Sequence, residues 1–404
     1  MIVNLKEQHC ENFLQSLHKE QWQEVRLGEV AKQIVSGGTP KSTQAEYYNG
    51  NIPWLNTKEV KNCRIYATER QITELGLCNS SAKWIDKNSV IVAMYGATAG
   101  KVAINKIPLT TNQACCNISV DSEKANYNFI YYTLLDSFDR LDQMTSGAAQ
   151  QNLNVGLISN FTFLLPPLTT QQKIAEILSS FDDKIDLLHR QNKTLESLAL
   201  TLFRHYFIDN PNRSEWEEKP LKYFGNIICG KTPPKNQKEY FNGTYPFIKI
   251  PDMHNNVFVF QTADSLTQQG LDSQKAKTLP PFSVCVSCIA TIGVVSMNAN
   301  IAQTNQQINS IVPHKEHYRY FLYCSMKSSF DELEAMASGG TATANLNTTD
   351  FSNMKLLLPR EKEILRFHTE TLPFFDKIYN NTKQIQNLQA MRDVLLKAIF
   401  KERE

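Results

Sequence analysis

The sequence predicts an α+β fold in which two similar mixed α/β domains are separated by two long antiparallel coiled-coil helices, with pseudo-two-fold symmetry. Two observations support this prediction. The chain repeats itself at a nearly constant offset, and each copy is followed by a long glycine-free stretch with apolar residues at helical spacing. The length of 404 residues also exceeds that of one ordinary domain.

Composition narrows the class of protein. Hydrophobic residues make up 42% of the chain, enough for a core in each domain, and the net charge is only +2. Proteins that coat nucleic acid without specificity usually carry a larger basic excess, so DNA contacts must come from local patches. Residues 1–9 lack the pattern of a signal peptide, and no apolar run reaches the roughly 20 residues that span a bilayer. We therefore expect a cytoplasmic protein without membrane contact.

The chain has nine cysteines, an odd number that is typical of free thiols in a reducing compartment. Cys285 and Cys288 form one CxxC within an apolar run. A zinc site would need a second pair, so we interpret both as small buried residues of a strand and expect no metal.

Residues 1–21 precede the repeat, whose two copies are 22–168 and 210–359. In the first segment, Phe13, Leu14 and Leu17 could form one face of a short helix that packs near the C-terminal helix. The copies match at Trp22 and Trp216. They also match at the Thr-Pro pairs 39–40 and 232–233 and at Pro166 and Pro359, and these two matches share an offset of 193 residues. The triplets Thr-Asn-Gln (111–113 and 304–306) and Asn-Leu-Asn (152–154 and 345–347) also recur. A repeat of this length indicates a duplicated domain.

Each copy has mixed secondary-structure signals. Residues 90–94 and 284–289 have the composition of buried strands, whereas 128–144 and 318–336 have the pattern of amphipathic helices. Glycine, proline, asparagine and threonine separate short strands between them. These features favour an α+β domain.

The stretches 169–209 and 360–404 have the pattern of a coiled coil. Their seam positions alternate steps of four and three residues, which places them along one side of a helix about 60 Å long. The expected seam residues are Ile174, Leu178, Ile185, Leu188, Asn192, Leu195 and Leu202 in the first stretch, and Phe374, Ile378, Asn381, Ile385, Leu388, Leu395 and Ile399 in the second. Pro373 is expected to kink the second helix or to delay its start.

One asparagine in each seam suggests a register. If the helices pair antiparallel with Asn192 opposite Asn381, apolar residues face each other at nearly all of the remaining seam positions. Only Phe181 against Arg392 fits badly. A polar pair fixes the register of a coiled coil at some cost in stability. The alternative is that both asparagines lie at the seam edge and face solvent or a partner. Two domains on such a spacer would have an approximate two-fold axis, a symmetry that the DNA backbone shares.

Three motifs together resemble the specificity subunits of type I restriction-modification systems. Residues 164–188 (LLPPLTTQQKIAEILSSFDDKIDLL) are similar to the first central conserved region of that family. Residues 22–40 (W…LG…SGGTP) resemble the start of its recognition domains, and residues 146–154 (SGAAQQNLN) a polar loop before the last strand. The resemblance covers the whole chain in two copies. The second copy departs from it at 359–362, where PREK replaces the Pro-Pro-Leu of the first.

The resemblance implies a function and a set of partners. Residues 22–168 and 210–359 would be target recognition domains, each reading one half of a bipartite site in double-stranded DNA. The helices 169–209 and 360–404 would dock two methyltransferase subunits and, through them, the restriction and translocase subunits. The methyl donor and ATP would belong to those partners, so the chain itself would be non-catalytic and hold no cofactor. The alternative functions are a coiled-coil scaffold that binds proteins and a methyltransferase fused to its recognition domain; the latter is disfavoured because no stretch remains for a catalytic domain.

Residues 96–102 (GATAGKV) are the stretch of the sequence that comes nearest to a catalytic motif, the phosphate-binding loop. A phosphate-binding loop needs one more residue between its glycines and a hydroxyl after the lysine, and the second copy keeps neither the first glycine nor the lysine. We interpret this stretch as a turn near DNA. The Asn-Pro-Pro-aromatic loop of adenine methyltransferases is absent from the sequence.

The candidate DNA contacts lie in loops and at positions where the two copies differ. Lysine and hydroxyl groups bind phosphates, whereas Arg, Lys, Asn and Gln read base edges. The candidates are Lys41, Gln44, Tyr47, Tyr48, Asn56, Lys58, Lys101, Gln150 and Gln151 in the first copy, and Lys231, Lys235, Asn236, Gln237, Lys238 and Lys249 in the second. The alternative is an ordinary solvated loop with tyrosines packed beneath it. The shared Thr-Asn-Gln and Asn-Leu-Asn triplets are expected to satisfy or position the backbone, because domains that read different sequences must differ where they touch bases.

Overall fold

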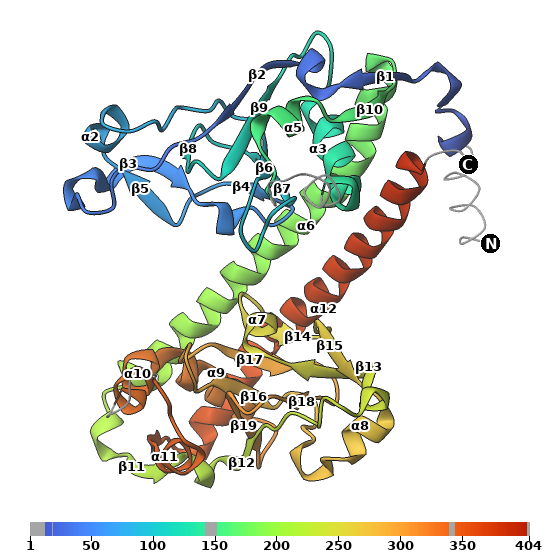
Figure 1. Cartoon of the computed structure of the whole chain (residues 1–404). Coiled ribbons are helices and arrows are strands. Elements are labelled where there is room, and N and C mark those ends of the chain that lie inside the picture. The colour runs from blue at the N-terminus through green and yellow to red at the C-terminus, as the bar shows by residue number, and fades with distance from the viewer. Residues whose placement is uncertain (1–12, 18, 142–151, 339–343, 402–404) are drawn as a thin grey trace. The chain divides into compact units, whose positions relative to one another are not determined.

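The computed structural model of the chain describes residues 13–17, 19–141, 152–338 and 344–401. Its contacts define two compact units, residues 1–184 with 388–404 and residues 185–387. Each unit holds one copy of the repeat together with a part of each long helix (Figure 1).

The first unit is built on a five-stranded sheet of order β2-β9-β6-β7-β4 and a three-stranded sheet of order β5-β3-β8. A separate pair, β1 with β10, joins the two ends of the copy. The strands are β1 (Gln23–Arg26), β2 (Ala31–Ser36), β3 (Tyr48–Leu55), β4 (Cys63–Ile65), β5 (Arg70–Ile72), β6 (Val90–Ala93), β7 (Val102–Asn105), β8 (Thr110–Thr111), β9 (Cys115–Val120) and β10 (Thr162–Leu165). β6 lies in the middle of its sheet and is wholly buried, as its run of Val and Ile predicts.

The second unit has the same sheet topology with every strand number raised by ten: β12-β19-β16-β17-β14, β15-β13-β18 and β11-β20. Its strands are β11 (Glu217–Pro220), β12 (Gly225–Cys229), β13 (Phe241–Ile248), β14 (Phe258–Val259), β15 (Asp264–Leu266), β16 (Val284–Ser287), β17 (Val295–Asn298), β18 (Gln303–Thr304), β19 (Ile308–Pro313) and β20 (Lys355–Leu358). The parallel pairs β3–β8 and β4–β7 recur as β13–β18 and β14–β17. This identity of strand order confirms the predicted domain duplication.

The short helices are set by caps that recur in both copies. They are α2 (Glu74–Cys78), α3 (Tyr127–Asp136) and α5 (Val155–Ser159) in the first unit, and α7 (Ile250–Met253), α8 (Gln268–Asp272), α9 (Tyr318–Ser328), α10 (Phe330–Ala337) and α11 (Thr348–Asn353) in the second. The last asparagine of each Asn-Leu-Asn triplet is an N-cap: Asn154 accepts from the Leu157 N–H at 3.0 Å and Asn347 from the Asp350 N–H at 2.9 Å. The triplets therefore satisfy backbone groups, as predicted.

The helix expected over 318–336 is wrong in one respect. It is broken into α9 and α10 at Ser329, whose N–H donates to the Ser325 carbonyl. Leu333 and Ala337 remain buried in the core, so the break redirects the second half while keeping its apolar face inside. In the first unit, α3 spans Tyr127–Asp136, the helix is interrupted at Ser137 and resumes over 138–141, and the rest of the predicted stretch, 142–144, lies outside the described residues.

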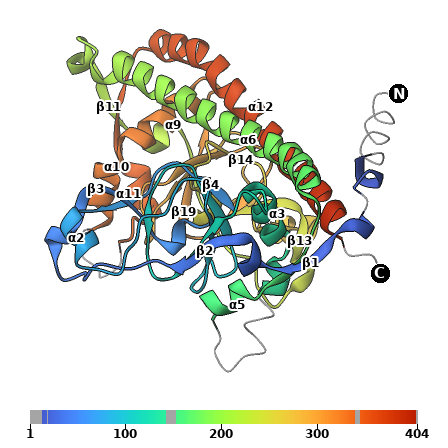
Figure 2. The ribbon, with the colours of Figure 1, turned by 90° about the horizontal axis from the view of Figure 1, so that it is seen from above.

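The two long helices form as predicted. α6 (Leu168–Phe203) continues as one π-helical turn (Arg204–Ile208), and α12 spans Glu361–Phe400. α12 runs through Pro373, so proline does not delay its start. At the start of α6, the Gln171 side chain donates to the Pro166 carbonyl at 2.9 Å and accepts from the Asn126 N–H at 2.9 Å. This glutamine joins the helix to the cap of α3, which lies beside α6 (Figure 2).

In the second unit the helices pair in the predicted register. The Asn381 side chain is 1% exposed and donates to the Asn192 side-chain oxygen at 2.9 Å. Further along, the Tyr206 hydroxyl donates to the Glu370 carboxylate at 3.0 Å. As the residue number rises in α6 it falls in α12, so the pairing is antiparallel. The asparagines therefore face each other, and the alternative in which both lie at the seam edge is wrong.

In the first unit the predicted mismatch is resolved by an ion pair. Arg392 turns from Phe181 to Asp182, and the Nη1 and carboxylate oxygen lie 2.6 Å apart. Asp182 also accepts from the buried Tyr132 hydroxyl at 2.6 Å. Burial, followed by the charge of Asp182, raises the pKa of Tyr132 above its usual range, so the hydroxyl keeps the proton it donates. Beyond this pair, Ile174 and Leu178 of α6 share one core with Leu396 and Ile399 of α12.

Where α12 packs on the core of a domain, the buried seam position is shifted by one residue from the predicted one. Phe375 is fully buried while the predicted Phe374 is only partly so, and Leu396 is more buried than the predicted Leu395. Phe375 stacks on Tyr320 of α9 with ring centroids 3.9 Å apart. The shift occurs because these turns pack on the core of a domain as well as on the other helix.

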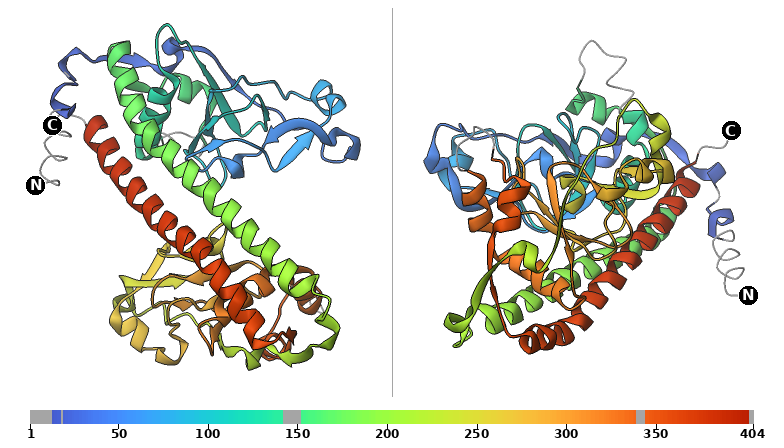
Figure 3. Two further views of the ribbon diagram at one scale, coloured as in Figure 1. Left: turned by 180° about the vertical axis from the view of Figure 1, so that it is seen from behind. Right: turned by 90° about the horizontal axis from the view of Figure 1, so that it is seen from below.

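The N-terminal segment packs as predicted. The N-terminal segment lies beside the end of α12 (Figure 3). Leu17 belongs to the same buried cluster as Leu396 and Ile399, with Phe13 and Leu14 against it. Lys19 Nζ donates to the carbonyl of Lys401 at 2.9 Å. Residues that precede the repeat thus cover the end of α12.

One buried histidine predicts a pH dependence. His368 of α12 stacks on Tyr320 at 5.1 Å, and burial, together with the charge of Arg319, lowers its pKa to about 4. Because the unfolded chain binds this proton near pH 6.5, the stability that neutral His368 contributes is present above that pH and is lost as the pH falls toward 4. We expect His368→Phe to reduce the fall in melting temperature of the second unit between pH 7 and 4. His205→Gln, at an exposed position, is the control and should leave that fall unchanged. An equal fall in wild type and His368→Phe would contradict the prediction.

Candidate nucleic-acid interface

A close approach of two backbones fixes the candidate loop of the first unit, which connects β2 to β3. The Gly37 N–H donates to the Cys115 carbonyl and the Gly38 N–H to the Thr111 carbonyl at 2.8 Å. A Cβ at Gly37 would lie 2.2 Å from the Thr111 carbonyl oxygen, and a Cβ at Gly230 of the second copy would lie 2.4 Å from the matching carbonyl oxygen of Thr304. Only glycine fits at this position in both loops.

The shared Thr-Asn-Gln triplets stabilise the same loops through side-chain hydrogen bonds. The Thr232 hydroxyl donates to the Gln306 side chain at 2.8 Å, and Thr39 makes the same hydrogen bond to Gln113. Asn112 exchanges two hydrogen bonds with Thr57, at 2.9 and 3.0 Å. The triplets thus have a structural role in the described loops, which is the role predicted for residues common to both copies.

The two candidate tyrosines anchor the first loop. The Tyr48 hydroxyl donates to the Pro40 carbonyl at 2.6 Å, and its ring meets Trp54 edge-on at 6.2 Å. The Tyr47 carbonyl accepts from the Thr73 N–H at 3.0 Å. These contacts favour the interpretation that the tyrosines support the loop from beneath.

The remaining candidates of the first unit differ in exposure. Lys41 and Gln44 are exposed on the loop, and Lys58 is exposed with an ion pair to Glu69 at 2.6 Å. Asn56 caps a short turn by accepting from the Lys58 N–H at 3.1 Å. Gln150 and Gln151 lie outside the described residues.

Lys101 follows a tight turn between two strands. Gly96 and Gly100 have φ values of +88° and +78°, and the turn connects β6 directly to β7. A phosphate-binding loop opens into a helix whose N-terminus holds the phosphate, so this turn lacks the geometry for that role. Lys101 is partly buried here.

In the second unit, two of the candidates, Lys235 and Lys249, lie at one cleft of about 450 Å³. Lys235 comes from the loop and Lys249 directly follows β13, while Asn305 and Gln306 belong to the triplet after β18. The other residues that line the cleft are Thr232, Phe241, Phe247 and Asp264. Lys231, Asn236 and Lys238 are exposed on the same loop and Gln237 is half-buried. The loop and the triplet, distant in sequence, therefore form one polar surface.

Sequence reasoning missed a basic segment beside the loop of the first unit and a turn with two lysines in the second unit. A Cβ at Gly38 would lie 2.2 Å from the Ala82 N, so the segment that leads to Lys83, half-exposed Trp84 and Lys87 touches the first loop. In the second unit Gln303, fully buried, donates to the Gln274 carbonyl at 3.1 Å and positions the turn with Lys275 and Lys277. Lysines at matching places in both copies were the signal that could have revealed it.

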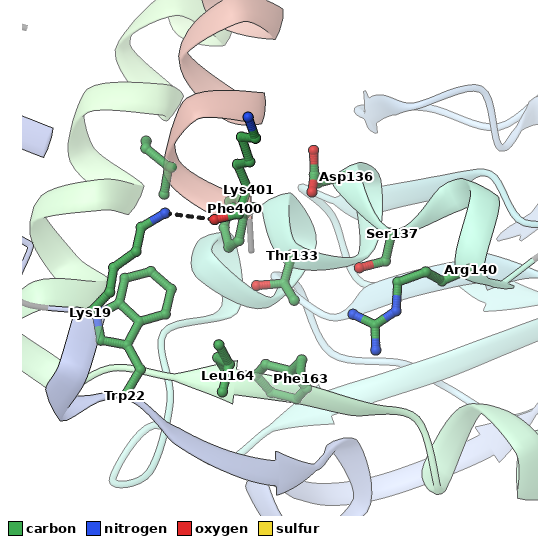
Figure 4. Close-up of a pocket in the computed structure, with 11 residues that line it drawn as sticks. Lys19, Trp22, Thr133, Asp136, Ser137, Arg140, Phe163, Leu164, Phe400 and Lys401 are labelled. Carbon is green, nitrogen blue, oxygen red and sulfur yellow. Dashed lines mark hydrogen bonds between the residues drawn. The ribbon is translucent and has the colours of Figure 1, made fainter. Parts of the chain in front are cut away.

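The first unit has a hollow of its own, of about 600 Å³, at the end of α12 (Figure 4). Lys19 and Trp22 border it on one side and Asp136, Ser137 and Arg140 on the other. Burial raises the pKa of Asp136, opposed by the charge of Lys397. This hollow is at the opposite end of the domain from β3 and α2 (Figure 1).

The cysteines are as predicted. All eight in the described part of the chain are free. Cys285 and Cys288 are buried at β16, and burial raises the pKa of both thiols to about 11, which disfavours the thiolate that a metal requires. Among the described residues, no group of three His, Cys, Asp or Glu side chains could hold a metal ion. No described helix is long and apolar enough to cross a membrane.

The structure is that of a two-domain protein in which a duplicated α+β domain is followed, in each copy, by a long helix. The chain belongs to the type I restriction modification DNA specificity family, because the model of that domain matches residues 19–197 and again 213–390. Its general role is therefore DNA sequence specificity in restriction-modification.

Several relatives match over nearly the whole chain. The type I restriction enzyme HindI specificity subunit of Haemophilus influenzae is 30% identical, over 93% of this chain and 98% of its own. The MjaIX specificity subunit of Methanocaldococcus jannaschii is 29% identical, over 93% and 91%. The crystal structure of a type I restriction-modification S subunit from M. genitalium covers 95% of this chain and 97% of its own with a TM-score of 0.54 at 16% identity, a likeness of fold.

Proposed function

We propose that the chain reads a bipartite DNA site, with residues 22–168 and 210–359 as the two target recognition domains. The observation that carries this proposal is the pairing of identical strand order with unlike loops. The glycines and triplets that support the loops are shared, whereas the exposed lysines differ: Lys41 in one, and Lys231, Lys235 and Lys238 in the other. One scaffold that presents two different surfaces suits an asymmetric site in two parts.

The long helices supply the spacer and a docking surface in this proposal. Five apolar side chains of α6 and α12 are 39 to 72% exposed: Leu187, Leu198, Leu365, Met391 and Val394. We assign the two helices to two methyltransferase subunits, which would bring the methyl donor and link the chain to ATP-dependent restriction subunits.

The chain would act without catalysis of its own, in the cytoplasm where its DNA is. A scaffold without DNA specificity, the alternative function, is disfavoured by the family to which the chain belongs.

The test is methylome sequencing of a host with and without the gene, together with duplex binding by the complex of this chain with its methyltransferase. We expect an asymmetric motif in two parts and an affinity that falls steeply with salt. A contiguous or palindromic motif would contradict bipartite reading by two unlike domains. Binding that is insensitive to both sequence and salt would instead support the scaffold.

A further inference from the structure

The cleft of the second unit contains a carboxylate where a DNA-binding surface would ordinarily carry cations. Asp264 is the one carboxylate among the described residues that line it, and its side chain forms an ion pair with Lys249. The two side chains are 43% and 40% exposed, so both can reach a ligand. The pair stands beside Asn305 and Gln306.

The backbone beneath this pair is held in place. The Asp252 carboxylate accepts from the Lys249 N–H at 2.9 Å and from the Ala263 N–H at 3.1 Å. Thr262 accepts from the Phe247 N–H at 3.1 Å, which ties β13 to the segment before β15. The backbone at Lys249 and Asp264 is therefore held in place. A side chain must be positioned in this way to discriminate between base edges.

A carboxylate near DNA is repelled by phosphates, so it is tolerated where it meets a hydrogen-bond donor. In the major groove the donors are the amino groups of cytosine and adenine. A lysine beside it needs acceptors, and guanine offers two, O6 and N7. A G·C pair presents both guanine acceptors and the cytosine amino group side by side.

We propose that Lys249 and Asp264 together read one G·C pair in the half-site of the second domain, an inference that rests on the proposed DNA-reading function. Lys249 donates to the guanine acceptors and Asp264 accepts from the cytosine amino group. In the free protein the two charges neutralise each other, and on DNA both exchange this ion pair for base contacts.

The first domain has different chemistry at the same place. In β3–β5, Trp54 pairs with Arg70, whereas in β13–β15 the matching Phe247 pairs with Asp264. At the position of Lys249 the first domain has Asn56, whose oxygen is used as a cap. The charge at this one strand position is therefore reversed between the copies, Arg70 against Asp264, and only the second half-site should depend on a carboxylate.

The test compares the recognised motif of three complexes, each with the methyltransferase: wild type, Asp264→Asn and Asp376→Asn. Asp376 is exposed on α12, outside the cleft, and its change removes the same charge. Motifs are obtained by selecting bound duplexes from a random pool and by methylome sequencing. With Asp264→Asn, we expect the preference of the complex for a G·C pair at one position of one half-site to fall about 10-fold. With Asp376→Asn, that preference should be unchanged. The other half-site should be unchanged in both.

The outcomes separate this inference from the proposed function. If the wild-type complex binds without sequence preference, the function itself is wrong. If wild type has a motif and Asp264→Asn keeps it at every position, or if the affected position is an A·T pair, the reading assigned here is wrong. Should Asp264→Asn abolish binding, Lys249→Gln tests the same base pair, and an unaltered motif overturns the inference.

Discussion

Asp182→Ala should destabilise the first unit by about 3–5 kcal/mol, because it removes the partner of a charge that is already buried. The Asp182 side chain is 9% exposed and that of Arg392 15%, at an N–O distance of 2.6 Å. Without the carboxylate, Arg392 loses this compensation and the buried Tyr132 hydroxyl loses its acceptor. Hydrogen exchange of the α6 amides from 174 to 182 measures the effect within this unit.

The chain contains a matched control for this change. Asp393 touches the same guanidinium at 2.8 Å, but its side chain is 54% exposed. Asp393→Ala should cost less than about 1 kcal/mol, since water and salt screen an exposed pair. Replacing the buried pair by Leu and Met should cost only about 1–3 kcal/mol, because both charges are removed together and the remaining loss is the acceptor of the Tyr132 hydroxyl. If Asp182→Ala and Asp393→Ala cost the same, the buried pair does not have the role assigned to it.

The triple variant Lys231→Gln, Lys235→Gln, Lys238→Gln should weaken duplex binding by the methyltransferase complex on the order of 100-fold at moderate salt. Three phosphate contacts would be lost, and with them the release of their counterions. The slope of log affinity against log salt should therefore decrease in size by about 2 to 3. Binding titrations at several salt concentrations measure both quantities.

The control for this variant changes three exposed lysines of the same unit outside the loop: Lys222, Lys355 and Lys362. The change in net charge is identical. Screening at physiological salt should limit its effect to a small factor, because the Debye length is about 8 Å. Equal loss of affinity in the two triple variants would show that net charge, and not this loop, sets the binding.

Much of the fold could be predicted because its signals are local or repeated. The alternation of four and three residues reports which side of a helix is buried, and the pairing of Asn192 with Asn381 follows from counting along two seams. The repeat predicted the shared topology, since equal spacing of strands and turns yields the same sheet twice. It also allowed structural residues to be separated from variable ones, as the cap at Asn154 shows.

The sequence could not predict contacts that join distant segments. Arg392 is 210 residues from Asp182, and helical periodicity describes a seam position without saying which neighbouring carboxylate a long side chain will reach. Phe375 is buried in place of Phe374 because a second surface, the ring of Tyr320, packs on the same turn. Asp264 was not among the candidates, since a lone aspartate at the start of a short strand has no pattern of its own.

By itself, the sequence determined the number of domains, their likeness, the two helices and the register of their asparagine pair. These follow from periodicity and repetition, which are properties of one chain read in order. Only the tertiary structure decided that Lys249 and Asp264 share a cleft with the Thr-Asn-Gln triplet, and that a misfit in the seam becomes a buried ion pair. Charge pairing depends on distances of a few ångströms between side chains, and those distances exist only once the sheets and helices have packed.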